Sequence, residues 1–142
     1  MTADCFLDTN ILIYAHDIEA QDKHEKAKKV VCSFWNDNGA LISTQVLQEF
    51  YVNVTKKVSQ PLSLVTARRI VEQYQVWPVV SNTIKNVIRA SEIQERYQLS
   101  FWDSLIISAA ESGGAKTILS EDLSHNQTIA GIRIENPLIE YP

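Results

Sequence analysis

Glycine, proline and cysteine are scarce in this chain, which has four Gly, four Pro and two Cys among 142 residues. No apolar run is long enough to span a bilayer, and the start lacks the basic-then-apolar order of a signal peptide. With 45% hydrophobic and 21% charged residues, the length suits one compact core. We therefore expect a single domain over residues 1–142, cytoplasmic and without a membrane segment.

Metal-binding patterns built from cysteine or histidine are also missing. Cys5 and Cys32 show no CxxC spacing and have no nearby histidine, so we expect both to be buried, reduced thiols. The three histidines, His16, His24 and His125, are scattered in polar surroundings without ligand spacing. Their pattern favours solvated side chains.

Positive charge is in short supply. Thirteen Lys and Arg face 17 Asp and Glu, which gives a formal net charge of -4. Non-specific binding to nucleic acid depends on neutralising phosphates with Lys and Arg, so the net charge argues against binding nucleic acid by overall electrostatics. A phosphate-bearing substrate must be held locally, and the net charge does not exclude a metal-dependent nuclease.

Strand-like and helix-like segments alternate along the chain. Apolar runs predict strands at residues 5–7, 40–43, 76–80, 116–119 and 131–134. Spacings of three and four predict helices after Asn10, over 22–38, from Thr44 toward Val58, and over 63–74, 83–97 and 100–112. This alternation predicts an α/β layered fold with a mostly parallel sheet. In such sheets, ligands bind beyond the carboxyl ends of the strands.

Four acidic residues fall at the ends or flanks of these elements. Asp8 and Asp122 follow two predicted strands, Glu49 lies on a core helix, and Asp103 lies in the first turn of helix 100–112. If they meet, each like-charge pair ~4 Å apart costs roughly 4 kcal/mol at an effective dielectric of about 20. Such a cluster must take up protons or a divalent cation. Oxygen ligands suit Mg²⁺ or Mn²⁺.

Each acid also has an ordinary structural explanation. Asp8 could cap the helix that follows it, and a lone helical Glu49 is usually solvated. Ser100 and Asp103 fit the S-x-x-[DE] pattern of a capping box. Asp122 stands in a polar turn, where Asp often makes local hydrogen bonds. From the residues alone, both interpretations stay open.

Other catalytic motifs are absent from the sequence. It contains neither a Gly-rich phosphate loop nor a G-x-S-x-G elbow. The segment Asp8-Thr9-Asn10 lacks the second Asp, two positions later, that a phosphoaspartate phosphatase uses. Hydrolysis by a nucleophilic side chain is therefore not favoured.

In four segments the chain resembles the PIN-domain ribonucleases, and among them the VapC-type toxins of toxin–antitoxin pairs. The segments are Phe6-Leu7-Asp8-Thr9-Asn10-Ile11-Leu12-Ile13-Tyr14, Ser43-Thr44-Gln45-Val46-Leu47-Gln48-Glu49-Phe50, Ser100-Phe101-Trp102-Asp103-Ser104-Leu105-Ile106 and Leu119-Ser120-Glu121-Asp122-Leu123. The resemblance implies a three-layer α/β/α fold around a central, mostly parallel sheet. It also implies a metal-dependent endoribonuclease that hydrolyses RNA phosphodiester bonds.

The resemblance further implies roles for individual residues. Asp8 and Asp103 would bind Mg²⁺ or Mn²⁺ directly, Asp122 would bind or hold a second ion through water, and Glu49 would orient the attacking water. Asn10 is a secondary member of the site, and Glu121 competes with Asp122 as the fourth acid.

Partners are implied as well: an RNA substrate, an antitoxin protein and a second copy of the chain in a homodimer. Candidate RNA-gripping residues, which could equally be a solvated helix face, are Lys56, Lys57, Arg68, Arg69 and Lys85. The alternative to a nuclease is a PIN-like module that binds RNA or protein without cleaving.

Overall fold

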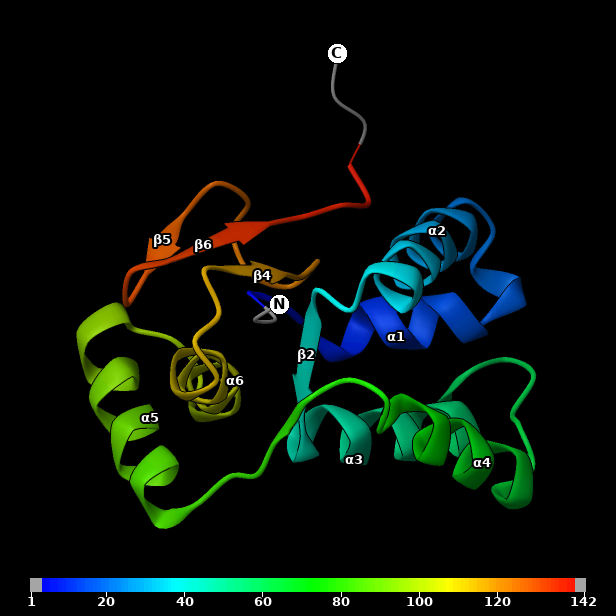
Figure 1. Ribbon diagram of the computed structural model, residues 1–142, viewed down its shortest axis with the longest axis horizontal. Coiled ribbons are helices and arrows are strands. Elements are labelled where there is room, and N and C mark those ends of the chain that lie inside the picture. The colour runs from blue at the N-terminus through cyan, green and yellow to red at the C-terminus, as the bar shows by residue number, and fades with distance from the viewer. Residues whose placement is uncertain (1–3, 140–142) are drawn as a thin grey trace.

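A six-stranded sheet forms the middle of the protein, and helices pack on both of its sides in the computed structural model, which describes residues 4–139 (Figure 1). Helix α1 (Thr9–His16) contacts α2 (Asp22–Asp37) and α3 (Thr44–Val52), and α3 contacts α4 (Leu64–Tyr74). Helix α5 (Ile84–Tyr97) packs mainly on α6 (Phe101–Ser112). The expected three-layer α/β/α architecture is confirmed.

The elements follow the predicted alternation. The strands are β1 (Cys5–Leu7), β2 (Ala40–Ser43), β3 (Val79–Val80), β4 (Thr117–Leu119), β5 (Thr128–Ile129) and β6 (Ile132–Glu135). The helices are α1 (Thr9–His16), α2 (Asp22–Asp37), α3 (Thr44–Val52), α4 (Leu64–Tyr74), α5 (Ile84–Tyr97) and α6 (Phe101–Ser112). A short 3-10 turn covers Ile18–Ala20, and a π-helical segment covers Asn53–Lys57.

The sheet has the order β3-β2-β1-β4-β6-β5, and every neighbouring pair is parallel except β5 and β6. Strand β1 lies between β2 and β4, which explains why Phe6 and Leu7 are fully buried. The backbone N–H of Asp8 donates to the carbonyl of Leu119 at 2.9 Å. This bond continues the β1–β4 ladder by one residue, so the segments after both strands start side by side.

Three details differ from the sequence prediction. Strand β3 begins only after Pro78, because proline has no N–H for a sheet ladder. Strand β5 was not predicted; it is two residues long and turns back onto β6 through Ala130 and Gly131, both with positive φ. The helix from Thr44 keeps α-helical bonding only to Val52 and then widens into the π-helical segment.

The prediction of two buried thiols is wrong for Cys32, which is exposed on α2. Helix α2 buries only a narrow stripe that includes Ala27 and Val31, and Cys32 lies off that stripe. Cys5 is partly buried in β1, and burial raises the pKa of its thiol to about 12. Both cysteines are free, as expected. Within residues 4–139, no helix combines the length and apolar character needed to cross a membrane.

Candidate carboxylate site

Asp8 lies at the junction of β1 and α1 and is only 4% exposed. Its Oδ1 accepts a hydrogen bond from the N–H of Thr9 at 2.7 Å, so it does cap α1. Its Oδ2 accepts from the hydroxyl of Ser120 at 2.7 Å. Burial raises the pKa of Asp8 to about 6, and the charges of Asp122 and Glu49 add to this, against the two hydrogen bonds. Asp8 therefore caps α1, and its negative charge is unfavourable in this buried position.

Glu49 reaches the same place from α3. The hydroxyl of Thr9 donates to its Oε1 at 2.8 Å, although the two residues are 40 positions apart. The side chain is partly buried, so the solvated-helix explanation for Glu49 is wrong. Because Thr9 is also the residue that Asp8 caps, the start of α1 holds both carboxylates.

Asp103 approaches from the start of α6. Ser100 caps this helix, since its hydroxyl oxygen accepts from the N–H of Asp103 at 3.1 Å. Burial raises the pKa of the Asp103 carboxyl, and the negative charge of Asp122 raises it further, while the contact with Ser100 lowers it. The Ser100 half of the predicted capping box is therefore present, and the Asp103 carboxyl also feels the charge of a second carboxylate.

Asp122 stands on the loop that follows β4. The buried Ser120 organises this loop, because its oxygen accepts from the N–H groups of Asp122 at 3.1 Å and Leu123 at 3.4 Å while its hydroxyl donates to Asp8. The Asp122 side chain itself is exposed. Its charge acts on both Asp8 and Asp103, so Asp122 links the two electrostatically.

Glu121, the competitor of Asp122, is held on both carboxylate oxygens. The hydroxyl of Tyr14 donates to Oε1 at 2.7 Å, and the ammonium of Lys23 lies 2.8 Å from Oε2. Although burial acts to raise the pKa of Glu121, the contacts with Lys23 and Tyr14 lower it overall. Its N–H donates to Oδ1 of Asn10 at 3.2 Å. Both carboxylate oxygens of Glu121 are thus engaged by other side chains, whereas the exposed Asp122 side chain is more available to bind a metal ion.

The side-chain amide nitrogen of Asn10 is available to bind a ligand in the site. Its Nδ2 atom is buried and has no hydrogen-bond partner among the described residues. An unsatisfied buried donor costs free energy, so such a group commonly meets a water or an anion. This observation fits a secondary place for Asn10 at the site.

The charges of the four acids are not compensated by protein cations. In the part of the chain that the structure describes, no Lys or Arg pairs with Asp8, Glu49, Asp103 or Asp122. In the same part, no three Asp, Glu, His or Cys side chains already stand close enough to hold a metal ion. The all-oxygen donor set suits Mg²⁺ or Mn²⁺ in kind. Binding would therefore require at least three of these side chains to come closer together than they stand in the described residues.

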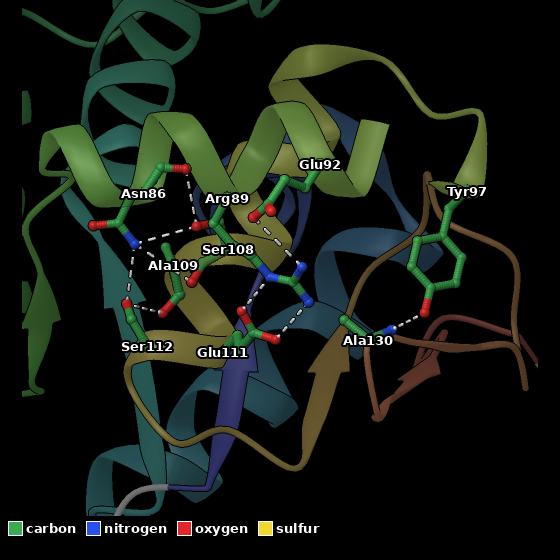
Figure 2. Close-up of polar contacts among 9 residues, drawn as sticks. All are labelled: Asn86, Arg89, Glu92, Tyr97, Ser108, Ala109, Glu111, Ser112 and Ala130. Atoms are coloured by element: carbon green, nitrogen blue, oxygen red, sulfur yellow. Dashed lines mark hydrogen bonds and ion pairs between the residues drawn. The ribbon is translucent and has the colours of Figure 1, made fainter. Parts of the chain in front are cut away.

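A polar contact network fastens α6 to α5 and thereby fixes the helix that carries Asp103. Figure 2 shows the Nδ2 of Asn86 near Ser108 and Ser112, both at 3.2 Å, and Arg89 in a two-pronged pair with Glu111. Asn86 is buried and fully bonded, so this network is best understood as packing support.

The histidines are not solvated, which corrects the prediction. A ring nitrogen of His16 lies 2.7 Å from the hydroxyl of Tyr74, and burial lowers the pKa of His16. His24 contacts the carbonyl of Tyr14 at 2.8 Å, and His125 accepts from a backbone N–H at 3.0 Å. All three are used in packing, and none joins the carboxylate site.

Sequence reasoning missed three supporting residues, Thr9, Ser120 and Lys23. Their partners lie 40 or more positions away along the chain, so no local pattern marks them. The five basic candidates are all exposed and are spread over the π-helical segment, α4 and α5: Lys56, Lys57, Arg68, Arg69 and Lys85.

The family model of the PIN domain matches residues 5–129. Among curated protein sequences, none matches the chain. Several solved structures are similar in fold.

One similar structure is a toxin–antitoxin complex from Klebsiella pneumoniae, with 18% identity, a TM-score of 0.69, and coverage of 94% of this chain and 98% of that one. Another is DNA-bound VapBC from Salmonella typhimurium, at 22% identity and a TM-score of 0.66, covering 96% and 99%. A third is VapC20 of Mycobacterium tuberculosis, described as a toxin that cleaves the sarcin-ricin loop, at 19% identity and a TM-score of 0.66, covering 84% and 90%.

Proposed function

Because the chain belongs to the PIN domain family, we propose that it is a metal-dependent endoribonuclease and the toxin of a toxin–antitoxin pair. The observation that carries the proposal is the charge pattern around Asp8. Asp8 is 4% exposed, and burial together with the charges of Asp122 and Glu49 raises its pKa to about 6, while no Lys or Arg among the described residues pairs with it. Uncompensated carboxylates of this kind favour a bound divalent cation.

The proposed roles follow from how firmly each acid is held. Asp8 is fixed by Thr9 and Ser120, and each of its oxygens keeps a further lone pair, so it is suited to direct ligation. Asp103, at the start of a capped helix, is the second direct ligand. Asp122 is exposed and less constrained, which suits a ligand or a water-mediated holder of a second ion.

Glu49 is proposed to orient the attacking water. Thr9 occupies only its Oε1, and the second oxygen can accept a proton from water. A bound Mg²⁺ or Mn²⁺ would supply a lowered pKa for that water and neutralise charge on the scissile phosphate. Asn10 is proposed to donate its unpartnered Nδ2 hydrogen to a phosphate oxygen or to a water in the site.

The partner proposals rest on the similar structures. Those from Klebsiella pneumoniae and Salmonella typhimurium are complexes of toxin with antitoxin. We propose that this chain is likewise inhibited by an antitoxin, and that a basic antitoxin side chain enters the acidic site, where it would meet complementary charge. We also propose that the protein is located in the cytoplasm and forms a homodimer.

The test is cleavage of a structured RNA by purified protein in Mg²⁺ or Mn²⁺, beside Asp8→Asn and an Asp37→Asn control. Asp37 is an exposed acid at the end of α2, away from the four acids in the fold. Metal-dependent cleavage by wild type and control, with a loss of about 100-fold or more in Asp8→Asn, is expected. Equal cleavage by all three would remove Asp8 from the active site.

One observation favours the second candidate, a PIN-like module that binds without cleaving. The side chains of the described residues do not form a ready-made metal site. The presence of all four acids without cationic partners argues for the nuclease. RNA binding by wild type without cleavage in either metal would decide for the binding module.

A further inference from the structure

Among the described residues, Trp102 is the aromatic side chain that the fold leaves most exposed. Its exposed fraction is 63%, against 40% for Trp35 and 1% for Trp77. The exposure of Trp35 is explained by packing, because its ring meets Tyr74 and Trp77 edge-on at 5.8 and 5.5 Å. In the described residues, the one ring contact of Trp102 is with its chain neighbour Phe101. Packing therefore does not account for Trp102.

The position of Trp102 places it beside the carboxylate site. It is the second residue of α6 and directly precedes Asp103. Helical side chains lean toward the N-terminus of their helix, which favours a position of the Trp102 ring near the start of α6. The start of α6 is also where Asp103 feels the charge of Asp122.

The backbone under Trp102 is firmly held. The buried Gln45, at the start of α3, donates its Nε2 hydrogen to the carbonyl of Trp102 at 3.2 Å. Ser100 caps the same helical turn. An exposed indole on a fixed backbone loses little freedom when a flat ligand stacks on it, which favours such binding.

The charge of the protein makes a stacking contact valuable for holding RNA. The formal net charge is -4, no Lys or Arg among the described residues pairs with the four acids, and Lys23 is already paired with Glu121, the neighbour of Asp122 in the chain. Phosphate neutralisation therefore supplies little affinity here. Base stacking on an aromatic ring needs no positive charge and works with any base.

We propose that Trp102 is a base-stacking platform that holds an unpaired nucleotide of the RNA beside the scissile phosphate. The proposal rests on the proposed nuclease function and adds to it a residue that binds the RNA, at a segment whose bases are unstacked and free. Bases in a continuous duplex are stacked on each other and do not offer a free face to the indole. Trp102 thereby becomes a specificity-determining residue.

Steady-state cleavage of a short single-stranded oligoribonucleotide tests the platform. Trp102→Ala should raise KM by about 10-fold or more with kcat nearly unchanged, because a uniform binding contact is lost. Trp102→Phe should recover part of the affinity, and Trp35→Phe is the matched control with wild-type kinetics. An unchanged KM in a folded, cleaving Trp102→Ala variant overturns the proposal and leaves the nuclease function standing.

Binding is measured separately, so that the two proposals can fail separately. In the Asp8→Asn background, a single-stranded oligoribonucleotide should quench tryptophan emission, whereas an abasic strand of equal length and a blunt duplex should not. Trp102→Phe should abolish the quench, and Trp35→Phe should keep it. Wild type that never cleaves but shows this pattern would refute the nuclease and keep the platform. No quench, or a Trp102→Ala variant that changes only the oligomeric state, refutes the platform.

Discussion

Ser120 donates a hydrogen bond to Oδ2 of Asp8 at 2.7 Å across 112 positions of sequence. The same Ser120 oxygen accepts the N–H of Asp122. One buried hydroxyl thus connects the carboxylate after β1 with the loop after β4, and it sets the distance between two of the four acids.

Replacing Ser120 by alanine should loosen this connection. Asp8 loses a donor and the loop loses its acceptor, so we expect a loss of about 1–3 kcal/mol in the free energy of unfolding. Urea denaturation at pH 7 measures it. Ser33→Ala is the control, because Ser33 is exposed and donates only to a carbonyl of its own helix, and its stability should stay near that of wild type. If the two variants lose equal amounts, the Ser120 contact is not a significant support.

Asp8→Asn should stabilise the metal-free protein at neutral pH. The pKa of Asp8 rises from 3.8 to about 6 on folding, so the folded protein binds the proton more tightly than the unfolded chain. Its contribution to stability therefore falls as pH rises from about 4 to 6 and is lost above that, a difference of up to about 3 kcal/mol. Asparagine stays neutral and its Oδ1 can still accept from Thr9, but it lacks the second oxygen that accepts from Ser120, so the net gain is smaller than the charge difference alone.

Melting curves in EDTA at pH 5 and pH 7.5 check this prediction. The wild type should lose more stability between the two pH values than Asp8→Asn does, and the variant should be the more stable protein at pH 7.5. If Asp8→Asn melts below wild type at pH 7.5 in EDTA, the ionised Asp8 carboxylate does not destabilise the folded protein.

Adding Mn²⁺ should make wild type more stable than Asp8→Asn, the reverse of their order of stability in EDTA. An ion that binds only the folded state raises the melting temperature by mass action, and the wild type holds the complete set of acids. We expect a larger rise for wild type than for Asp103→Asn, with Asp37→Asn behaving like wild type. Identical rises for wild type and Asp103→Asn would reduce Asp103 to a helix-capping residue.

Glu121→Gln and Asp122→Asn should separate the two adjacent acids. Glu121 is already engaged by Tyr14 and Lys23, so its variant should keep most of the Mn²⁺-dependent rise and most of the cleavage. Asp122→Asn should lose most of both. The reverse pattern would make Glu121 the fourth acid and require Lys23 to leave it.

The sequence predicts those residues of the site whose positions follow from local sequence patterns and from the strand order. Asp8 was predictable from its place after a short apolar strand, since strand ends in a parallel sheet meet at one edge. Asp103 was recognisable as a residue near a helix start, and both its capping context and its proximity to Asp122 are present. These inferences needed only local pattern and topology.

Other features lay beyond such patterns. The position of Glu49 depends on the hydroxyl of Thr9, a contact across 40 residues that no helical periodicity encodes. His16 was expected in solvent and is instead packed against Phe50 and Tyr74, because a polar flank in sequence does not show which helix will cover it. Long-range contacts of this kind require the fold.

Diffraction from crystals soaked in Mn²⁺ is the most direct measurement of the central claim. Anomalous scattering locates manganese independently of activity. We expect a peak within about 2–2.5 Å of carboxylate oxygens of Asp8 and Asp103, with the Asp122 side chain also turned toward the ion, and no peak in Asp8→Asn crystals. Manganese bound elsewhere, or an empty carboxylate site at millimolar Mn²⁺, would contradict it.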